Sequence, residues 1–301
     1  MLGATDRLGE IRKAVWLGGC CVDSACMSAA DTVAYLGPAG TFTEAAALAF
    51  QAEPAKLAPY PTNAATLIAV AEGEVGWGVV PVENSVQGAV AATLDTLWQL
   101  EGLQIHRTQI MPIRHHLMGF ADRLDAIRTV YAHPQALAQC QQWLARNLPE
   151  AILVAATSNT SELKRLEGDR QLAAIASERA ARVYGVPILA RSIADYDNNC
   201  TRFWVVSREP SPGGNYTSLA FSAKANVPGA LVQPLQVLAR AGINMTRIES
   251  RPTKKAIGDY VFFIDLEHPD RADLSNVLQE LKQIVAVLKV FGSYPLQICT
   301  E

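Results

Sequence analysis

The sequence lacks a cysteine framework, a large net charge and a long apolar run, and each absence argues against a class of protein. Its 6 cysteines show no CxxC spacing, which argues against a disulfide scaffold and against a zinc site. With 26 basic and 29 acidic residues the net charge is −3, so no global charge attracts nucleic acid or an anionic membrane. No run approaches the ~20 apolar residues that span a bilayer. We therefore expect a cytoplasmic protein with no nucleic-acid or membrane partner.

The chain also lacks the patterns of secretion, of cofactor binding and of metal binding. Asp6 and Glu10 interrupt the positive start that a signal peptide requires, so we expect residues 1–30 to form a disordered N-terminal extension. The turn Gly37–Gly40 lacks the third glycine of a dinucleotide loop, and no Walker lysine or HExxH motif is present. His115 and His116 are adjacent, which places them on opposite faces of any strand. We expect no cofactor and no metal.

Strand and helix patterns alternate from Val33 onward and restart near His115. The first strand leads through a glycine turn into a helix whose capping box is Thr41 with Glu44. After the restart, helices are expected over residues 135–148 and after a cap at Asn159. This alternation predicts an α/β fold: a catalytic domain over 31–208 made of two lobes with a central cleft, the second lobe spanning about 114–192.

The segment EPSPGGN, residues 209–215, is the clearest linker in the chain. Beyond it, residues 216–301 show the strand and helix order βαββαβ, which predicts a ferredoxin-like domain. Modules of this type tend to pair with a copy of themselves, so we expect a homo-oligomer.

Candidate site residues lie where elements begin. Thr201 and Arg202 stand at the entrance to the apolar strand 203–206, where a hydroxyl and a guanidinium suit a small anionic substrate. Neutral donors at helix starts could converge on the same cleft and bind carboxylates without lysine; they are Thr41, Thr43, Asn84, Ser85, Ser158 and Asn159. From the residues alone an alternative stays open, in which Thr201 satisfies a turn, Arg202 pairs with a surface acid and the others are plain caps.

Several motifs together resemble one enzyme family from about Val33 to Tyr294. They are YLGPAGTFTEAA (35–46), VPVENSVQGAVAATLD (80–95), HHLMG (115–119), AHPQALAQC (132–140) and NNCTRF (198–203). With these motifs in this order, the chain resembles the prephenate dehydratase family. NVPGALV (226–232) and GINMTRIESRP (242–252) resemble the ACT regulatory domain of the same family.

The resemblance implies decarboxylating dehydration of prephenate to phenylpyruvate, carbon dioxide and water, without a cofactor. It implies that Thr201 donates to the departing ring hydroxyl and that Arg202 binds a carboxylate or shapes the pocket. It assigns the rest of the substrate site to Thr41, Asn84, Ser85, Ser158, Asn199 and Phe203. Because the product ring is aromatic, its formation drives the reaction and no redox partner is needed. The site has to bind a dianion and to help a poor leaving group, the hydroxyl, to depart.

The resemblance also implies feedback control by phenylalanine across a dimer interface of the ACT domain. The residues expected to bind the effector are Asn226, Gly229, Ala230 and Leu231 of one chain and Glu249 and Ser250 of its partner. Binding that closes the cleft to substrate must be reciprocal, so substrate should weaken phenylalanine binding.

One stretch departs from the family pattern, and two other functions remain open. Ser158-Asn159-Thr160-Ser161-Glu162 replaces a Ser-Thr pair followed by small alanines, and we expect Glu162 to point away from a dianionic substrate. The nearest alternative is arogenate dehydratase, the same chemistry on the aminated substrate. A different class is a non-catalytic amino-acid sensor, because two lobes around a cleft also describe solute-binding proteins.

Overall fold

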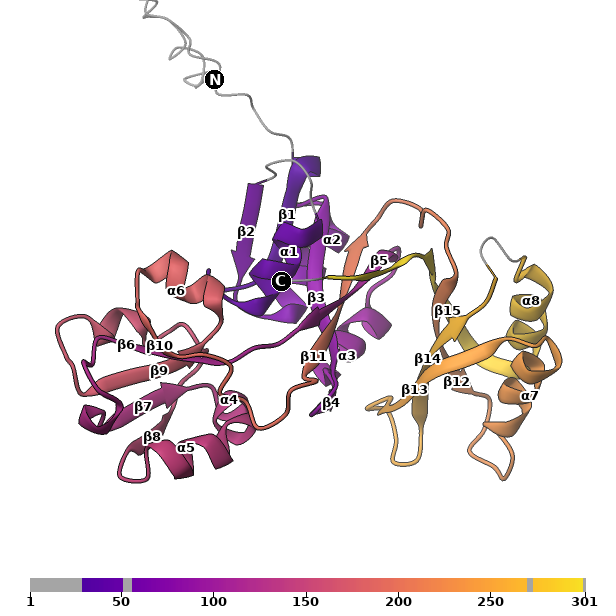
Figure 1. Ribbon diagram of the computed structural model, residues 1–301. Helices are drawn as coiled ribbons and strands as arrows, with labels where there is room; N and C mark the ends of the chain where they lie inside the picture. The colour runs from indigo at the N-terminus through magenta and orange to yellow at the C-terminus, as the bar shows by residue number, and fades with distance from the viewer. Residues whose placement is uncertain (1–28, 51–55, 270–272, 300–301) are drawn as a thin grey trace, which may run out of the picture.

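The computed structural model of the protein describes residues 29–50, 56–269 and 273–299. Within these ranges the strands form three sheets, with the first lobe between the second lobe and the C-terminal domain (Figure 1). The expected extension over 1–30 lies outside the described residues except for Ala29 and Ala30, which begin a short 3-10 helix. In the described part of the chain, no helix is long and apolar enough to cross a bilayer.

The first lobe is a seven-stranded mixed sheet with the order β16-β5-β11-β3-β1-β2, and β4 pairs with β3 beside this path. Its elements are η1 (Ala29–Asp31), β1 (Thr32–Leu36), α1 (Phe42–Phe50), β2 (Lys56–Tyr60), α2 (Asn63–Glu72), β3 (Trp77–Asn84), β4 (Gly88–Ala89), α3 (Ala91–Gln99), β5 (Gln104–Pro112), β11 (Cys200–Ser207) and β16 (Leu296–Ile298). Strand β1 runs parallel to β2 and β3, whereas β11 is antiparallel to both β3 and β5.

The capping box at the start of α1 forms with one change of partner. Thr41 Oγ1 accepts from Glu44 N at 3.2 Å, and Glu44 Oε2 accepts from Gly40 N at 2.8 Å. Gly40 has a φ of +85°, a left-handed value that glycine adopts without strain, and it lets the chain turn into the helix.

The second lobe is a five-stranded sheet with the order β10-β6-β9-β7-β8. Its elements are β6 (His116–Gly119), η2 (Leu124–Ala126), β7 (Thr129–Ala132), α4 (Pro134–Gln139), α5 (Gln141–Asn147), β8 (Ile152–Ala155), η3 (Leu163–Leu166), β9 (Leu172–Ala176), α6 (Glu178–Tyr184) and β10 (Ile188–Ala190). The two segments that join the lobes hydrogen-bond to each other, from Ile113 N to Asn199 O at 2.8 Å and from Ile193 N to His115 O at 2.9 Å.

Two predicted helices of this lobe differ in the structure. The helix expected over 135–148 is interrupted at Cys140, whose φ of −118° and ψ of 13° separate α4 from α5. No α-helix begins at Asn159, where we expected one; the next helical element is the 3-10 helix η3. The reason is local, because Ser158 Oγ accepts from the backbone of Thr160 and Ser161 and closes a turn instead of capping an α-helix.

The C-terminal domain, residues 216–294, is an antiparallel sheet with the order β13-β14-β12-β15. Its elements are β12 (Tyr216–Ala223), α7 (Val232–Arg240), β13 (Asn244–Pro252), β14 (Tyr260–Glu267), α8 (Ser275–Ile284) and β15 (Val285–Tyr294), the βαββαβ order expected from the sequence. Helices α7 and α8 cover the face of this sheet that points away from the first lobe (Figure 1).

The other face of this sheet packs on the first lobe, and the two share one hydrophobic core. Phe263, Phe291 and Tyr294 of the C-terminal sheet belong to the same buried cluster as Trp204 of β11 and Leu97 of α3. Burying one such side chain contributes about 1.5–3 kcal/mol. The C-terminal domain is therefore fixed to the first lobe by an apolar interface.

The chain after β15 returns to the first lobe. Leu296–Ile298, which we expected in the C-terminal domain, forms β16 and pairs in parallel with residues 108–110 of β5. This added strand ties the end of the C-terminal domain to the catalytic sheet.

Strand β11 separates the two sides of the first lobe. Phe203 and Val205 point to a core under α1, whereas Trp204 and Val206 point to the core shared with the C-terminal domain. By the same alternation Thr201 lies on the side of Phe203, and Arg202 lies on the side of Trp204.

Candidate active site

A cleft between the two lobes holds two adjacent cavities that share lining residues. The inner cavity has a volume of about 400 Å³ and the outer cavity about 690 Å³. Residues of both lobes line both cavities, namely Leu36, Phe42, His133, Gln135 and Asn159. The combined volume suits a small molecule held between two lobes.

Thr201 lies in the inner cavity, and its hydroxyl is oriented by an amide. Asn84 Nδ2 donates to Thr201 Oγ1 at 3.0 Å, and the two residues face each other across the β3–β11 pair. Thr201 is 8% exposed. None of the described residues accepts a hydrogen bond from its hydroxyl. The hydroxyl oxygen thus accepts from Asn84 while its hydrogen has no acceptor among these residues, so the hydroxyl can donate to a ligand.

Asn84 is itself held in one orientation. Its Oδ1 accepts from Val86 N and from Gln87 N, both at 3.1 Å, in a turn that follows β3. A flipped amide would bring two N–H donors onto those backbone donors, so Nδ2 must point toward Thr201. The turn chemistry of asparagine thus sets the direction of a side chain in the cleft.

A buried amide network extends from Asn84 into the second lobe. Asn84 Nδ2 also donates to Asn199 Oδ1 at 2.8 Å, and Asn199 Nδ2 donates to Gln139 Oε1 at 2.8 Å. His115 Nε2 lies 2.8 Å from the same Gln139 oxygen, which makes Nε2 the protonated nitrogen. Burial lowers the pKa of His115 below its ordinary value, so the ring is neutral.

Gln139 and His115 were not among the residues predicted for the site. Gln139 is 3% exposed and His115 is also 3% exposed, and both line the inner cavity. The motif AHPQALAQC contains Gln139, but nothing in its spacing separates it from an ordinary helical residue. The adjacency of His115 and His116 correctly suggested different environments without showing which ring lies at the cleft.

The other residues predicted for the substrate site divide between the cleft and other places. Phe203 lines the inner cavity, and Thr41 and Ser158 line the outer one. Asn199 lies behind Asn84 as its hydrogen-bond partner. Ser85 is exposed, and its Oγ accepts from Cys200 N at 2.9 Å, so it holds β11 and is not among the lining residues.

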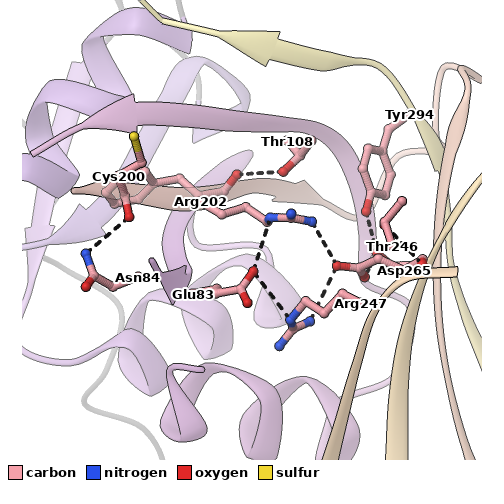
Figure 2. A network of polar contacts seen from close by, with 11 residues as sticks. Glu83, Asn84, Thr108, Cys200, Arg202, Thr246, Arg247, Asp265 and Tyr294 are labelled. Atoms are coloured by element: carbon pink, nitrogen blue, oxygen red, sulfur yellow. Dashed lines mark hydrogen bonds and ion pairs between the residues drawn. The ribbon is translucent and has the colours of Figure 1, made fainter. Parts of the chain in front are cut away.

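Arg202 lies on the far side of β11 from the cleft, although we expected it at the substrate. Its Nη1 lies 3.1 Å from Asp265 Oδ2 of the C-terminal domain, and its Nε lies 3.5 Å from Glu83 Oε2 (Figure 2). Successive side chains of a strand point to opposite faces, so Thr201 and Arg202 cannot both enter the cleft.

Among the described residues that line the two cavities, none is Lys, Arg, Asp or Glu. Glu162, which departs from the family pattern, forms an ion pair with Arg165 at 3.1 Å and is not a lining residue. The cleft therefore presents hydroxyls, amides, two imidazoles, backbone N–H groups at the start of α1 and an apolar wall. Cys140 offers no thiolate, because burial raises its pKa to about 12.

Contacts between the two lobes lie beside the outer cavity, which Gly40 and Ser177 line. Glu44 Oε2 of α1 accepts from Arg179 Nε of α6 at 2.6 Å, and Ser177 Oγ donates to Gly40 O at 2.7 Å. The Glu44 carboxylate is shielded from water, with its side chain 7% exposed, whereas that of Arg179 is 35% exposed. These contacts hold the second lobe against the glycine turn.

The fold and the site define a two-lobed α/β enzyme with a neutral donor cleft and a ferredoxin-like domain of regulatory type attached to it. The family model "Prephenate dehydratase" matches residues 33–211, and the model "ACT domain" matches residues 217–286. The chain belongs to the prephenate dehydratase family.

Individual relatives agree with this assignment. A bifunctional chorismate mutase/prephenate dehydratase of Aquifex aeolicus (strain VF5) is 41% identical over 283 residues, 92% of this chain and 78% of that protein. A prephenate dehydratase of Amycolatopsis methanolica is 39% identical over 87% of this chain and 88% of its own. The crystal structure of the Arthrobacter aurescens prephenate dehydratase in complex with L-Phe superposes with a TM-score of 0.78 at 34% identity, covering 88% of this chain and 90% of that one.

Proposed function

We propose that the cleft converts prephenate to phenylpyruvate, carbon dioxide and water. The observation that carries the proposal is the hydroxyl of Thr201, which is fixed by Asn84 and faces a cleft without charged side chains. In the reaction the bond from the ring to its carboxylate breaks, and that electron pair forms the new ring double bond. The bond to the ring hydroxyl breaks as carbon dioxide leaves, and the departing oxygen takes up a proton to become water.

Thr201 would act on the departing oxygen. A threonine hydroxyl is too weak an acid to give up its proton freely, so its part is a positioned hydrogen bond to the oxygen on which negative charge develops. Because Asn84 and its partners are in place before substrate binds, this donor needs no reorganisation during the reaction. The proton that completes the water molecule comes from solvent.

The apolar wall would favour the loss of carbon dioxide. Leu36, Phe42, Val90, Ile113 and Phe203 line the inner cavity. A cation beside the departing carboxylate would stabilise the ground state and slow its loss, whereas an apolar surface does not. The position of Arg202 outside the cleft is consistent with this requirement.

The second carboxylate of the substrate would be bound by neutral donors in the outer cavity. Ser158 lies there, and the first N–H groups of α1, those of Phe42 and Thr43, have no intrahelical acceptor. Thr41 caps this helix and donates its own hydroxyl to Leu36 O at 3.1 Å, so it positions these N–H groups. This mode of binding uses hydrogen bonds where many anion sites use lysine.

The lining also bears on the two alternative functions. Arogenate and free amino acids carry an ammonium group, and proteins usually bind such a group with a carboxylate. Since neither cavity is lined by a described Asp or Glu, the cleft favours the keto acid prephenate over arogenate and over amino acids. Steady-state turnover with prephenate and with arogenate in parallel tests this. A higher kcat/KM for arogenate would overturn the substrate assignment, and no turnover of either would favour a sensor.

We also propose feedback control by phenylalanine at the C-terminal domain. A cavity of about 460 Å³ lies there and is lined by the predicted effector residues Asn226, Gly229, Ala230 and Leu231. Glu249 and Ser250 do not line it; they lie on β13, at the open edge of the sheet. This division supports a site that the β13 edge of a second chain completes. The Arthrobacter aurescens relative was crystallised with L-Phe.

Exposed apolar side chains support the homo-oligomer. Val227, Val232, Tyr260 and Val287 line this cavity and are 44–56% exposed, which leaves an apolar rim for a partner chain to cover. Calorimetry with phenylalanine and sedimentation of the purified protein test the site and the pairing separately. Cytoplasmic location remains part of the proposal and rests on cysteine usage.

A further inference from the structure

Four charged side chains form a closed ring at the boundary between the first lobe and the C-terminal domain. Glu83 and Arg202 come from β3 and β11, and Arg247 and Asp265 come from β13 and β14 (Figure 2). Glu83 Oε2 lies 3.5 Å from Arg202 Nε and 3.7 Å from Arg247 Nε, and Asp265 Oδ2 lies 3.1 Å from Arg202 Nη1 and 3.5 Å from Arg247 Nη1. Each acid therefore contacts an arginine of either domain, and the charges cancel.

The ring lies largely away from water. The side chains of Arg247 and Asp265 are 5% and 2% exposed, that of Arg202 is 19% exposed, and that of Glu83, on the open side of the ring, is 33% exposed. Asp265 is held further by Ser218, whose Oγ donates at 2.5 Å, and Ser218 in turn contacts the hydroxyl of Tyr294. Charges in such a place interact strongly and are costly to leave unpaired, so a displacement of one member must move the others.

The ring lies on the opposite face of β3 and β11 from the Asn84–Thr201 pair of the cleft. Strands β3 and β11 pair Arg202 with Glu83 and, one residue along, Thr201 with Asn84. The first pair points to the C-terminal domain and the second to the cleft, and adjacent residues are joined by one rigid peptide unit of about 3.8 Å. A shift of Arg202 relative to Glu83 is therefore transmitted to the hydrogen bond that orients the Thr201 hydroxyl.

The ring also reaches the proposed effector strand. Arg247 lies on β13, two residues before Glu249 and three before Ser250, and within the sheet β13 pairs only with β14. One nitrogen of Arg247, Nη2, is buried and has no partner among the described residues. This nitrogen therefore does not anchor Arg247, which is held in the ring by Nε and Nη1 alone.

We propose that Arg202 is a positioning residue and that this ring couples the C-terminal domain to the cleft. The inference rests on the proposed feedback by phenylalanine and names the charged residues through which the effector site would act on the cleft. Effector binding at β13 moves Arg247 within the ring, Arg202 and Glu83 follow, and the Asn84–Thr201 pair loses its alignment. The ring is then the two-state element on which both sites act.

The test measures turnover and effector binding separately in matched variants. Arg247→Gln removes one charge of the ring, and the double variant Glu83→Gln/Arg247→Gln removes one charge of each sign and leaves the Arg202–Asp265 pair intact. Lys289→Gln is the control, because Lys289 of β15 also joins the domains but is not part of the ring: it contacts Glu101 at 2.6 Å and the carbonyls of Trp98 and Leu100 at the end of α3. For each protein we compare kcat and KM with and without phenylalanine, and calorimetry gives the Kd of phenylalanine.

The expected result is a loss of coupling without a loss of either function. Coupling factors between sites are typically about 5–150-fold, and both ring variants should bring this factor within about threefold of 1. The Kd of both variants for phenylalanine and the turnover of Arg247→Gln without it should stay within about threefold of wild type. The double variant, which also removes the Glu83–Arg202 contact beside Thr201, is judged by its coupling factor and its Kd alone, and Lys289→Gln should keep full coupling. The double variant decides the matter if the single variant does not fold.

Four results would overturn the coupling alone, and a fifth would overturn the catalytic proposal as well. The ring variants could be inhibited like wild type, they could lose phenylalanine binding itself, or the control could lose coupling equally. A wild type that turns over prephenate but ignores phenylalanine also removes the coupling and leaves the catalytic proposal standing. A wild type without turnover overturns both.

Discussion

The replacement of Thr201 by valine tests the central assignment with almost no change of shape. Valine keeps the branched side chain that fills the space beside Phe203 but has no hydroxyl. If the hydroxyl stabilises the departing oxygen, its loss removes a hydrogen bond made chiefly in the transition state. Removing one such donor costs about 10²–10³-fold in kcat, or about 2.7–4 kcal/mol. We expect this loss in kcat with little change in KM.

The same replacement should leave the fold nearly as stable as before. Asn84 Nδ2 loses one acceptor but keeps Asn199 Oδ1 at 2.8 Å and the carbonyl of Cys200 at 3.2 Å. Since no buried donor is orphaned, the free energy of unfolding should fall by only about 1 kcal/mol. Urea unfolding of the variant measures this term separately from catalysis.

The assay follows phenylpyruvate release at neutral pH, with Thr201→Ser as the matched control. Serine keeps the hydroxyl and loses the methyl group that limits its rotation, so its kcat should stay within about tenfold of wild type. A folded valine variant that keeps more than a third of the wild-type kcat would refute the role of the hydroxyl. A rise in KM alone would assign Thr201 to substrate binding.

Three further perturbations test the surroundings of the cleft. Glu44→Gln weakens the contact to Arg179, which joins the lobes at 2.6 Å, and should lower the free energy of unfolding by about 1–2 kcal/mol and raise KM. Gly40→Ala places a Cβ about 3.0 Å from Ala180 Cα at a φ of +85° and should cost about 1–2 kcal/mol in urea unfolding. Burial lowers the pKa of His115 below 6.5, so the unfolded chain binds a proton that the folded ring does not. Stability present above pH 6.5 should be lost as the pH falls toward the folded pKa, by at most about 1.4 kcal/mol per pH unit.

Each of these has an outcome that contradicts it. The Glu44 argument fails if the variant unfolds and binds substrate like wild type, and the Gly40 argument fails if alanine stabilises the protein. For His115, thermal unfolding at about pH 7.5 and about pH 5.5 is compared with His115→Gln, which cannot titrate. Equal losses of stability in the two proteins would show that the ring does not contribute.

The sequence predicted the elements whose cause is local. The capping box of Thr41 and Glu44, the strand from Phe203 to Val206 and the βαββαβ order after residue 215 follow from short-range patterns, and the structure contains all of them. The helix expected over residues 135–148 is interrupted at Cys140, because hydrophobic periodicity does not reveal where one helix turns into another. The cap expected at Asn159 is absent because Ser158 closes a turn there first.

Part of the candidate site could have been placed better from the sequence itself. Successive side chains of a strand point to opposite faces, the rule that we applied to His115 and His116. Applied to Thr201 and Arg202, the same rule predicts that only one of the two can enter the cleft. Gln139 carried no comparable signal, because its role depends on contacts with Asn199 and His115, which lie 60 and 24 residues away in the chain.

What the sequence determined by itself is the order of elements, the donors at their starts and the motifs of the family, because these depend on neighbours in the chain. The tertiary structure alone decided which face of β11 borders the cleft and which borders the C-terminal domain, since both faces are buried and only the packing partners distinguish them. It also brought β16 beside β5 and closed the ring of Glu83, Arg202, Arg247 and Asp265. Such contacts join residues far apart in the chain, and no local pattern encodes them.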